Sequence, residues 1–63
     1  MLVNGQNIEI ETTSILEILG HFELNPDQIA VERNGEILPR SLWSEVQLAA
    51  GDRIELIRFV GGG

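Results

Sequence analysis

The alternation of apolar and polar residues at the start of the chain predicts a β-hairpin. Asn4-Gly5 is typical of a type I′ turn, because both central residues of that turn need positive φ. The turn joins a short strand, Leu2-Val3, to an alternating strand over residues 7–11. Ile8 and Ile10 share one face of the second strand, and we expect that face to join the core.

A helical period follows the first hairpin. Ser14 and, three residues later, Glu17 form a capping-box pattern, in which the serine oxygen accepts a backbone N–H and the glutamate reaches back. The apolar residues after it recur at helical spacing and predict one stripe, made of Ile15, Leu16, Ile18, Leu19 and Phe22. Gly20 falls near the end of the pattern, and Asn25-Pro26-Asp27 is expected to stop the helix. A helix this short is marginal alone, so it must pack on a sheet.

A second hairpin completes the middle of the chain. Residues 29–33 and 36–38 are predicted strands on either side of Asn34-Gly35, a second type I′ turn signal. Residues 39–44 are expected to form a turn or one short 3₁₀ segment. Gln47-Leu48 is predicted as a brief extended piece.

The last predicted strand, residues 53–60, opens after Gly51-Asp52 and is largely apolar on both faces. Strict alternation places Ile54, Leu56, Arg58 and Val60 on one face and Glu55, Ile57 and Phe59 on the other. Two apolar faces are typical of a central strand. One helix covers only one face of a sheet, so the other face either exposes apolar surface, which often marks a partner site, or lies under residues 39–43.

Composition limits the chain to one small domain. It has 63 residues, of which 43% are hydrophobic, and a domain of about 60 residues buries only about 60% of its unfolded surface. With no cysteine, no disulfide, thiolate metal site or cysteine nucleophile is available, and the single His21, at the predicted helix end, is expected to be structural. No apolar run has the length of a membrane span and no signal peptide is recognisable, so we expect a soluble, cytoplasmic protein.

The charge is strongly acidic. Ten acidic residues oppose four arginines, there is no lysine, and the formal net charge is −6. This balance argues against nucleic-acid binding, which needs a basic surface. It is compatible with docking on a basic partner, and equally with net charge that keeps a small domain in solution.

The chain closes on Gly61, Gly62 and Gly63, which have no side chains to pack. The α-carboxylate of Gly63 is the reactive group of this tail, and it is ionised at neutral pH. Because the sequence begins with Met1, we expect a complete gene product rather than an excised fragment. Activation by a nucleotide triphosphate would turn the carboxylate into an acyl group on a thin, flexible arm. The alternative interpretation is a linker or a frayed end.

The sequence over residues 3–5, 30–43, 48–55 and 59–63 resembles that of one family, the ThiS sulfur carriers of thiamine biosynthesis. The resemblance implies an α+β, ubiquitin-like β-grasp fold, with a mixed four- to five-stranded sheet packed on one helix. It further implies a domain over residues 1–60 and a flexible glycine tail over residues 61–63.

The same resemblance implies a reaction sequence. An ATP-dependent activating enzyme, related to ubiquitin activators, converts Gly63 to an acyl adenylate. Sulfur from a donor such as a cysteine desulfurase then gives a C-terminal thiocarboxylate, and thiazole synthase takes that sulfur into the thiazole ring. Gly61 and Gly62 thread the tail into partner active sites, where any Cβ on Gly62 would obstruct entry. The chain itself binds no cofactor or metal, has no catalytic residues and is not an enzyme.

Docking residues and rival functions remain open from the sequence. Ile57 and Phe59, close to the tail, are the preferred docking residues. Arg40 and Trp43 are further candidates, because both residue types anchor interfaces. The alternative for Trp43 is that its indole plugs the end of the core. The alternatives are the small subunit of molybdopterin synthase, a ubiquitin-like protein modifier and a plain β-grasp interaction or RNA-binding module.

Overall fold

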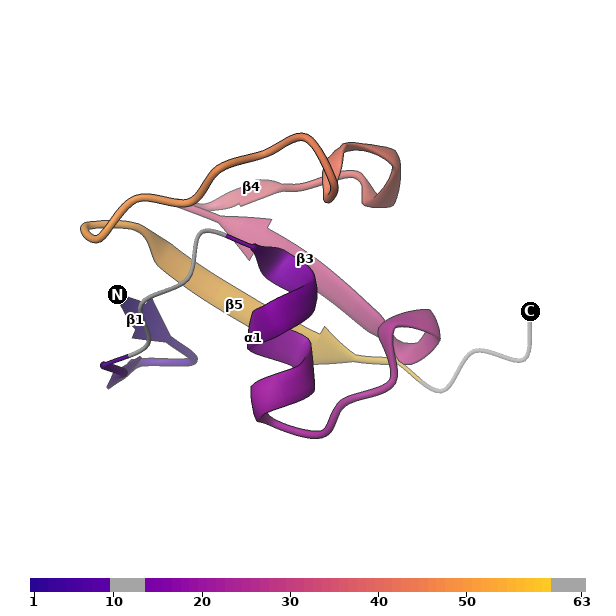
Figure 1. Cartoon of the computed structure of the whole chain (residues 1–63), viewed down its shortest axis with the longest axis horizontal. Helices are drawn as coiled ribbons and strands as arrows, with labels where there is room; N and C mark the ends of the chain where they lie inside the picture. The colour runs from indigo at the N-terminus through magenta and orange to yellow at the C-terminus, as the bar shows by residue number, and fades with distance from the viewer. Residues whose placement is uncertain (10–13, 60–63) are drawn as a thin grey trace.

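The computed structural model describes residues 1–9 and 14–59 (Figure 1). Its strands are β1 (Leu2–Val3), β2 (Gln6–Asn7), β3 (Ile29–Arg33), β4 (Glu36–Ile37) and β5 (Arg53–Arg58). Its helices are α1 (Ile15–His21) and the 3₁₀ segments η1 (Pro26–Gln28) and η2 (Arg40–Leu42). The predictions made for Ile10, Glu11, Val60, Gly61, Gly62 and Gly63 lie outside the described residues.

The strands form one five-stranded sheet in the order β2-β1-β5-β3-β4. β5 is its central strand, parallel to β1 and antiparallel to β3, and the two hairpins form the flanks. This mixed sheet with one α-helix across it is the predicted ubiquitin-like β-grasp fold. The central position of β5 agrees with its two apolar faces.

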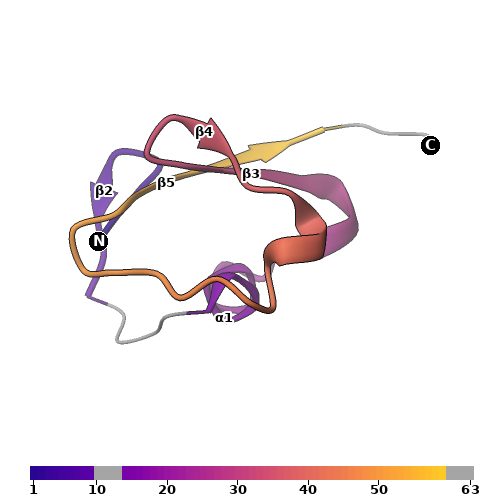
Figure 2. The ribbon, with the colours of Figure 1, turned by 90° about the horizontal axis from the view of Figure 1, so that it is seen from above.

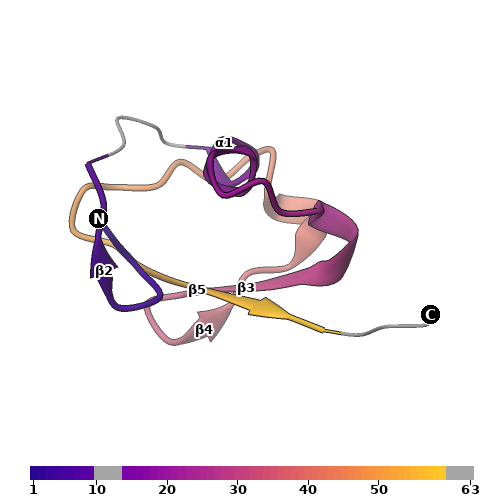
Figure 3. The same cartoon turned by 90° about the horizontal axis from the view of Figure 1, so that it is seen from below.

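One side of the sheet carries the rest of the structure. Figures 2 and 3 show α1 and the connection from η2 to β5 on the same side of the sheet. The buried apolar core of the described residues lies between these layers, and its members are Val3, Ile15, Ile18, Leu19, Ile29, Val31, Trp43, Leu48 and Ile54. No segment within residues 1–9 and 14–59 forms a layer over the opposite face of the sheet, which we call the outer face.

The apolar stripe of α1 is narrower than predicted. Ile15, Ile18 and Leu19 are buried, but Leu16 is 50% exposed and Phe22 is 36% exposed. Leu16 is next to Ile15, and one residue turns the helix by about 100°, so its side chain leaves the stripe. Phe22 has left the helix, since it is the C-cap residue with φ −92° and ψ 4°. Including these two residues in the stripe was therefore wrong.

The start of α1 agrees with its sequence pattern, but its end does not. Ser14 is the N-cap, and its Oγ accepts the Glu17 N–H at 3.4 Å. At the other end Glu23 has φ +56°, and its N–H donates to the Gly20 carbonyl at 3.1 Å, while the next N–H reaches Leu19 at 2.9 Å. These two bonds make a Schellman motif, which ends the helix before Asn25-Pro26-Asp27.

The predicted stop at Asn25-Pro26-Asp27 was therefore misplaced, and this tripeptide has another role. The Asn25 Oδ1 accepts the Asp27 N–H at 3.0 Å and caps η1. η1 then leads directly into β3.

Three short segments differ from the predicted strands. β2 ends at Asn7, although Ile8 still packs against the core as expected. Gln47-Leu48 is not a strand, and Leu48 is instead buried in the core. β4 is one residue shorter than predicted, with the Leu38 N–H donating to Val31 O at 2.8 Å just beyond it. The segment predicted for residues 39–44 does contain a 3₁₀ turn, η2.

Glu23 offers a direct test of the helix end. A non-glycine residue in the left-handed region is strained by about 1–2 kcal/mol, so Glu23→Gly should stabilise the domain by about 0.5–1 kcal/mol. Gly20→Ala should stabilise it by a similar amount, about 0.5–1 kcal/mol, because Gly20 is helical and nothing lies within 4 Å of an added Cβ. Urea unfolding measures both. Destabilisation by Glu23→Gly would contradict the assigned motif.

Candidate functional site

The structure places two of the predicted docking residues, Ile57 and Phe59, at the end of the described chain. Ile57, Arg58 and Phe59 are the last three described residues, and we call them the tail root. The glycines at 61–63 lie outside the described residues. Ile57 and Arg58 are the end of β5, and the Phe59 N–H extends the pairing by donating to the Gln28 carbonyl at 3.0 Å.

The outer face of the sheet is apolar beside the tail root. Ile57 pairs with Ala30 across β5 and β3, and directly paired residues point to the same face. Phe59 follows Ile57 by two residues and therefore shares its face. Ile57 is 43% exposed and Phe59 45% exposed. The sequence left open whether this face exposes apolar surface or lies under residues 39–43, and the structure shows that it exposes apolar surface.

Ile37 widens the same surface. It pairs with Glu32 in the register of β3 and β4, so it also points to the outer face, and it is 65% exposed. We call Ile37, Ile57 and Phe59 the apolar patch. Ile37 is in β4 and Ile57 in β5, the two strands that flank β3 in the sheet, and Phe59 directly follows β5.

Trp43 and Arg40 have different positions near this patch. Trp43 is only 5% exposed, and its indole N–H donates to the Leu38 carbonyl at 3.0 Å, so the indole plugs the core. The Arg40 guanidinium lies over the ring, 5.7 Å from its centroid, and pairs with Asp27. A pocket of about 240 Å³ lies here, with Trp43, Arg40 and Phe59 among its lining residues. Arg40 is therefore accessible at the rim, while Trp43 forms a wall.

The first Asn-Gly turn holds β5 from one side. Asn4 and Gly5 both have positive φ, 52° and 80°, as a type I′ turn requires. The Asn4 N–H donates to the Ile54 carbonyl at 2.9 Å, and the Asn4 Oδ1 accepts the Leu56 N–H at 2.7 Å. The side chain thus adds one bond to β5 after β1 has ended.

The second Asn-Gly turn holds the start of β5 from the other side. Asn34 and Gly35 have φ of 52° and 86°. The Asn34 N–H donates to the Arg53 carbonyl at 2.8 Å, and the Asn34 Oδ1 accepts the Arg53 N–H at 2.9 Å. Both turns therefore bind the strand that leads to the tail.

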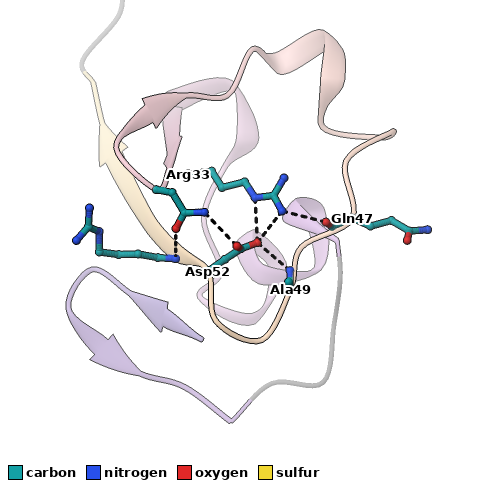
Figure 4. Close-up of polar contacts among 6 residues, drawn as sticks. Arg33, Gln47, Ala49 and Asp52 are labelled. Carbon is teal, nitrogen blue, oxygen red and sulfur yellow. Dashed lines mark hydrogen bonds and ion pairs between the residues drawn. The ribbon is translucent and has the colours of Figure 1, made fainter.

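A buried carboxylate joins this second turn to the loop before β5 (Figure 4). Asp52 is 7% exposed, and its Oδ2 accepts the Arg33 Nε–H at 2.9 Å and the Ala49 N–H at 2.8 Å. Its Oδ1 accepts an Asn34 amide N–H at 3.1 Å. Arg33 also donates to the Gln47 carbonyl at 3.3 Å. The sequence pattern had placed Gly51-Asp52 only at the opening of the last strand, because two partners of Asp52, Arg33 and Asn34, lie 19 and 18 residues away along the chain.

These contacts lower the pKa of Asp52 below its ordinary value of 3.8. The Ala49 backbone N–H is the largest cause, and the Asn34 amide and the Arg33 guanidinium act in the same direction against the opposing effect of burial. Asp52 is therefore charged at neutral pH and stabilises the junction of three segments.

Other kinds of site find little support in the described ranges. No group of three or more His, Asp or Glu side chains there is placed to hold a metal ion. No helix among those residues is both long and apolar enough to cross a membrane. His21 is exposed at the end of α1, with its ring edge-on to Phe22 at 5.0 Å, and its surroundings suit a structural role.

Comparison with known proteins gives consistent matches over the whole chain. The model of the ThiS family matches residues 1–63. The sulfur carrier protein ThiS of Bacillus subtilis is 36% identical over 63 residues, covering 97% of this chain and 96% of that protein. The crystal structure of a thiamine biosynthesis protein (ThiS) from Geobacter metallireducens superposes with a TM-score of 0.76 at 30% identity, covering 98% of this chain and 96% of that one.

A second group of relatives is much longer. The chain is 34% identical to a thiazole synthase of Paramagnetospirillum magneticum over 64 residues, which is 100% of this chain and 20% of that protein. A thiazole synthase of Magnetococcus marinus is 36% identical over 97% of this chain and 19% of its own length. The chain thus spans about a fifth of the length of these two relatives.

Asp52→Asn tests the carboxylate junction. The amide keeps the shape but loses charge-assisted bonds, so we expect a loss of about 1–3 kcal/mol in unfolding free energy at neutral pH. The folded-state pKa of Asp52 is depressed, so its contribution is intact above the ordinary pKa of 3.8 and is lost as the pH falls through the folded value.

The difference in unfolding free energy between wild type and Asp52→Asn, measured from chemical unfolding curves, should therefore shrink below about pH 4. Glu45→Gln, which changes an exposed carboxylate, is the control. If the difference in unfolding free energy between wild type and Asp52→Asn stays constant down to acid pH, the charge of Asp52 is not its cause.

Proposed function

The chain belongs to the ThiS family, and we propose from this premise that it is a sulfur carrier of thiamine biosynthesis whose working group is the C-terminal carboxylate of Gly63. The observation that carries the proposal is the family match over residues 1–63, which includes the glycine tail. The B. subtilis sulfur carrier matches over nearly the same length. The fold supports it, because β5 leads directly toward the tail.

The proposed chemistry has two steps on the tail. The Gly63 carboxylate attacks the α-phosphate of ATP, which gives an acyl adenylate and releases pyrophosphate. In the second step, persulfide sulfur from a donor such as a cysteine desulfurase displaces AMP to give an acyl disulfide, and a thiol cleaves that disulfide, forming a new disulfide with the donor and leaving the thiocarboxylate. Activation is needed because a carboxylate anion is a poor electrophile. Gly61 and Gly62 add no Cβ, so the tail fits a narrow channel.

In this proposal the chain is a substrate of its partners and not a catalyst. ATP is bound by a ubiquitin-activator-like adenylating enzyme, and the chain itself needs no cofactor. We place this chemistry in the cytoplasm, where ATP is available. Neither a nucleic acid nor a membrane is required.

Thiazole synthase is the proposed acceptor of the sulfur. Two proteins named thiazole synthase contain a region that matches nearly all of this chain. Two modules in one polypeptide meet at a raised effective concentration, which favours modules that act on each other. This pairing supports the separate chain and a thiazole synthase as partners.

The apolar patch is the proposed docking surface for the enzymes that receive the tail. Ile57 and Phe59 lie next to the tail and on the uncovered outer face. Exposed apolar patches on small domains often bind partners. Arg40, accessible at the pocket rim, adds a charged contact, and Trp43 shapes the pocket from within.

The direct test is the intact mass of the protein after incubation with an adenylating enzyme, ATP and a sulfur donor. We expect a gain equal to the exchange of one oxygen for one sulfur. Conjugates with other proteins would instead indicate a modifier, and an unchanged mass would contradict the carrier function.

Gly62→Ala is the matching variant, because its added Cβ should obstruct the channel and slow thiocarboxylate formation. Gly51→Ala is the control, since nothing lies within 4 Å of a Cβ added there and the residue is remote from the tail in sequence. Equal rates of thiocarboxylate formation for the two variants would contradict the prediction that a Cβ on Gly62 obstructs the channel.

A second prediction concerns the apolar patch. Ile57→Ser should weaken binding to thiazole synthase by about tenfold or more, as expected for a buried interface anchor. Leu16→Ser is the control, because Leu16 on α1 is similarly exposed, 50% against 43% for Ile57, but lies across the sheet. Calorimetric titration measures both. Equal weakening by the two substitutions would show that the patch has no special role.

A further inference from the structure

The two edges of β5 are paired to different extents. Along one edge β3 pairs with five of the six residues of β5, from Ile54 opposite Arg33 to Arg58 opposite Ile29. Along the other edge β1 is in register only with Arg53 and Ile54. The side chain of Asn4 extends this pairing as far as Leu56 and no further.

The direction of the backbone groups follows from the bonds that are made. Arg53 and Phe59 bond toward β3, through Asn34 and Gln28. The direction of the backbone N–H and carbonyl groups alternates from one residue to the next along a strand. The backbone groups of the even-numbered residues of β5 therefore point toward the β1 side, as the bonds of Ile54 and Leu56 to Asn4 confirm.

Three backbone groups beside the tail are consequently open. The Leu56 carbonyl and the N–H and carbonyl of Arg58 point away from β3, and no hydrogen bond joins them to another described residue. We call these three groups the free edge. In Figures 2 and 3, α1 lies in a separate layer, and the last part of β5 has only β3 beside it in the sheet.

We propose that the free edge binds an extended segment of thiazole synthase, which joins the sheet as an added strand next to β5. The inference rests on the proposed function and specifies how the partner holds the tail root. Strand addition is a general mode of recognition, in which main-chain bonds give affinity and alternate side chains give specificity.

Thiazole synthase is assigned as the partner of the free edge on two grounds, the position of the edge beside the tail and the thiazole synthases that contain a similar region. The free edge belongs to the residues that immediately precede the tail, so a protein that takes up Gly63 has to pass close to it. Thiazole synthases that contain a ThiS-like region indicate that these two modules work together. An enzyme that binds both the tail and the free edge would hold the chain at the tail root.

The side chains around the free edge define the chemistry of the added strand. Ile57 and Phe59 point to the outer face, and Arg58 to the other. Neighbouring strands favour apolar pairs and opposite charges on one face. The added strand should therefore place an apolar side chain beside Ile57 and an acidic side chain beside Arg58.

The free edge is too short to promote aggregation of the protein when no partner is bound. Long, flat and uncharged edges promote aggregation, whereas short edges with charged side chains resist it. The free edge has three backbone groups and an exposed arginine. It is suited to a partner that also binds the apolar patch and the tail.

Amide hydrogen exchange of the wild-type protein, alone and with thiazole synthase, tests the proposal. The Arg58 N–H should exchange fast in the free protein and be strongly protected in the complex. The Ile57 N–H points toward β3 and should be protected in both states, which makes it the internal control. A complex in which the Arg58 amide still exchanges fast would overturn the proposal.

Two substitutions separate the backbone group from the side chain. Arg58→Ala removes the charge and keeps the N–H, whereas Arg58→Pro removes both, and proline is tolerated where a strand N–H faces outward. Arg58→Pro should bind thiazole synthase about tenfold more weakly than Arg58→Ala, the effect of one lost hydrogen bond. Retained protection of the Ile57 amide shows that the variant is folded.

The outcomes distinguish the two proposals. Equal affinities of Arg58→Pro and Arg58→Ala, with normal thiocarboxylate formation, overturn the strand addition and leave the carrier function standing. Absence of binding between wild type and thiazole synthase overturns the strand addition together with the partner assignment. Absence of a sulfur-dependent mass gain overturns the carrier function itself.

Discussion

The structure depends on the hydrogen bonds that hold β5 between two Asn-Gly turns. Asn4 binds the strand at Ile54 and Leu56, and Asn34 binds it at Arg53. In both turns positive φ brings the asparagine amide and its backbone to the central strand. Asp52 ties the second turn to the loop before β5. Local turn chemistry therefore positions the one strand from which the tail continues.

A second constraint is the small size of the chain. In the part of the chain that the structure describes, one α-helix and the connection from η2 to β5 cover one side of the sheet, and the core is filled from that side. The outer face keeps the apolar patch of Ile37, Ile57 and Phe59. In a larger domain another layer would bury these residues. Here they remain beside the tail root, where a partner that accepts the tail would meet them.

Much of this architecture was predictable because its signals are local. Both type I′ turns, the Ser14 cap, the second hairpin and the alternation of β5 depend on residues close together in sequence. The end of α1 was not predictable, since the left-handed residue is Glu23 rather than a glycine. The role of Asp52 was hidden because Arg33 and Asn34 are 19 and 18 residues away. The docking candidates Ile57 and Phe59 were found from period-two alternation, whereas the burial of Trp43 depends on tertiary packing.

The central claim is that the folded domain exists to present the carboxylate of Gly63 as a sulfur carrier. Tandem mass spectrometry of the protein purified from its own cells, grown with heavy sulfur, tests this most directly. The account predicts that fragment ions place one labelled sulfur, in exchange for one oxygen, on Gly63. Label on no residue, or a peptide bond from Gly63 to a lysine of another protein, would contradict it.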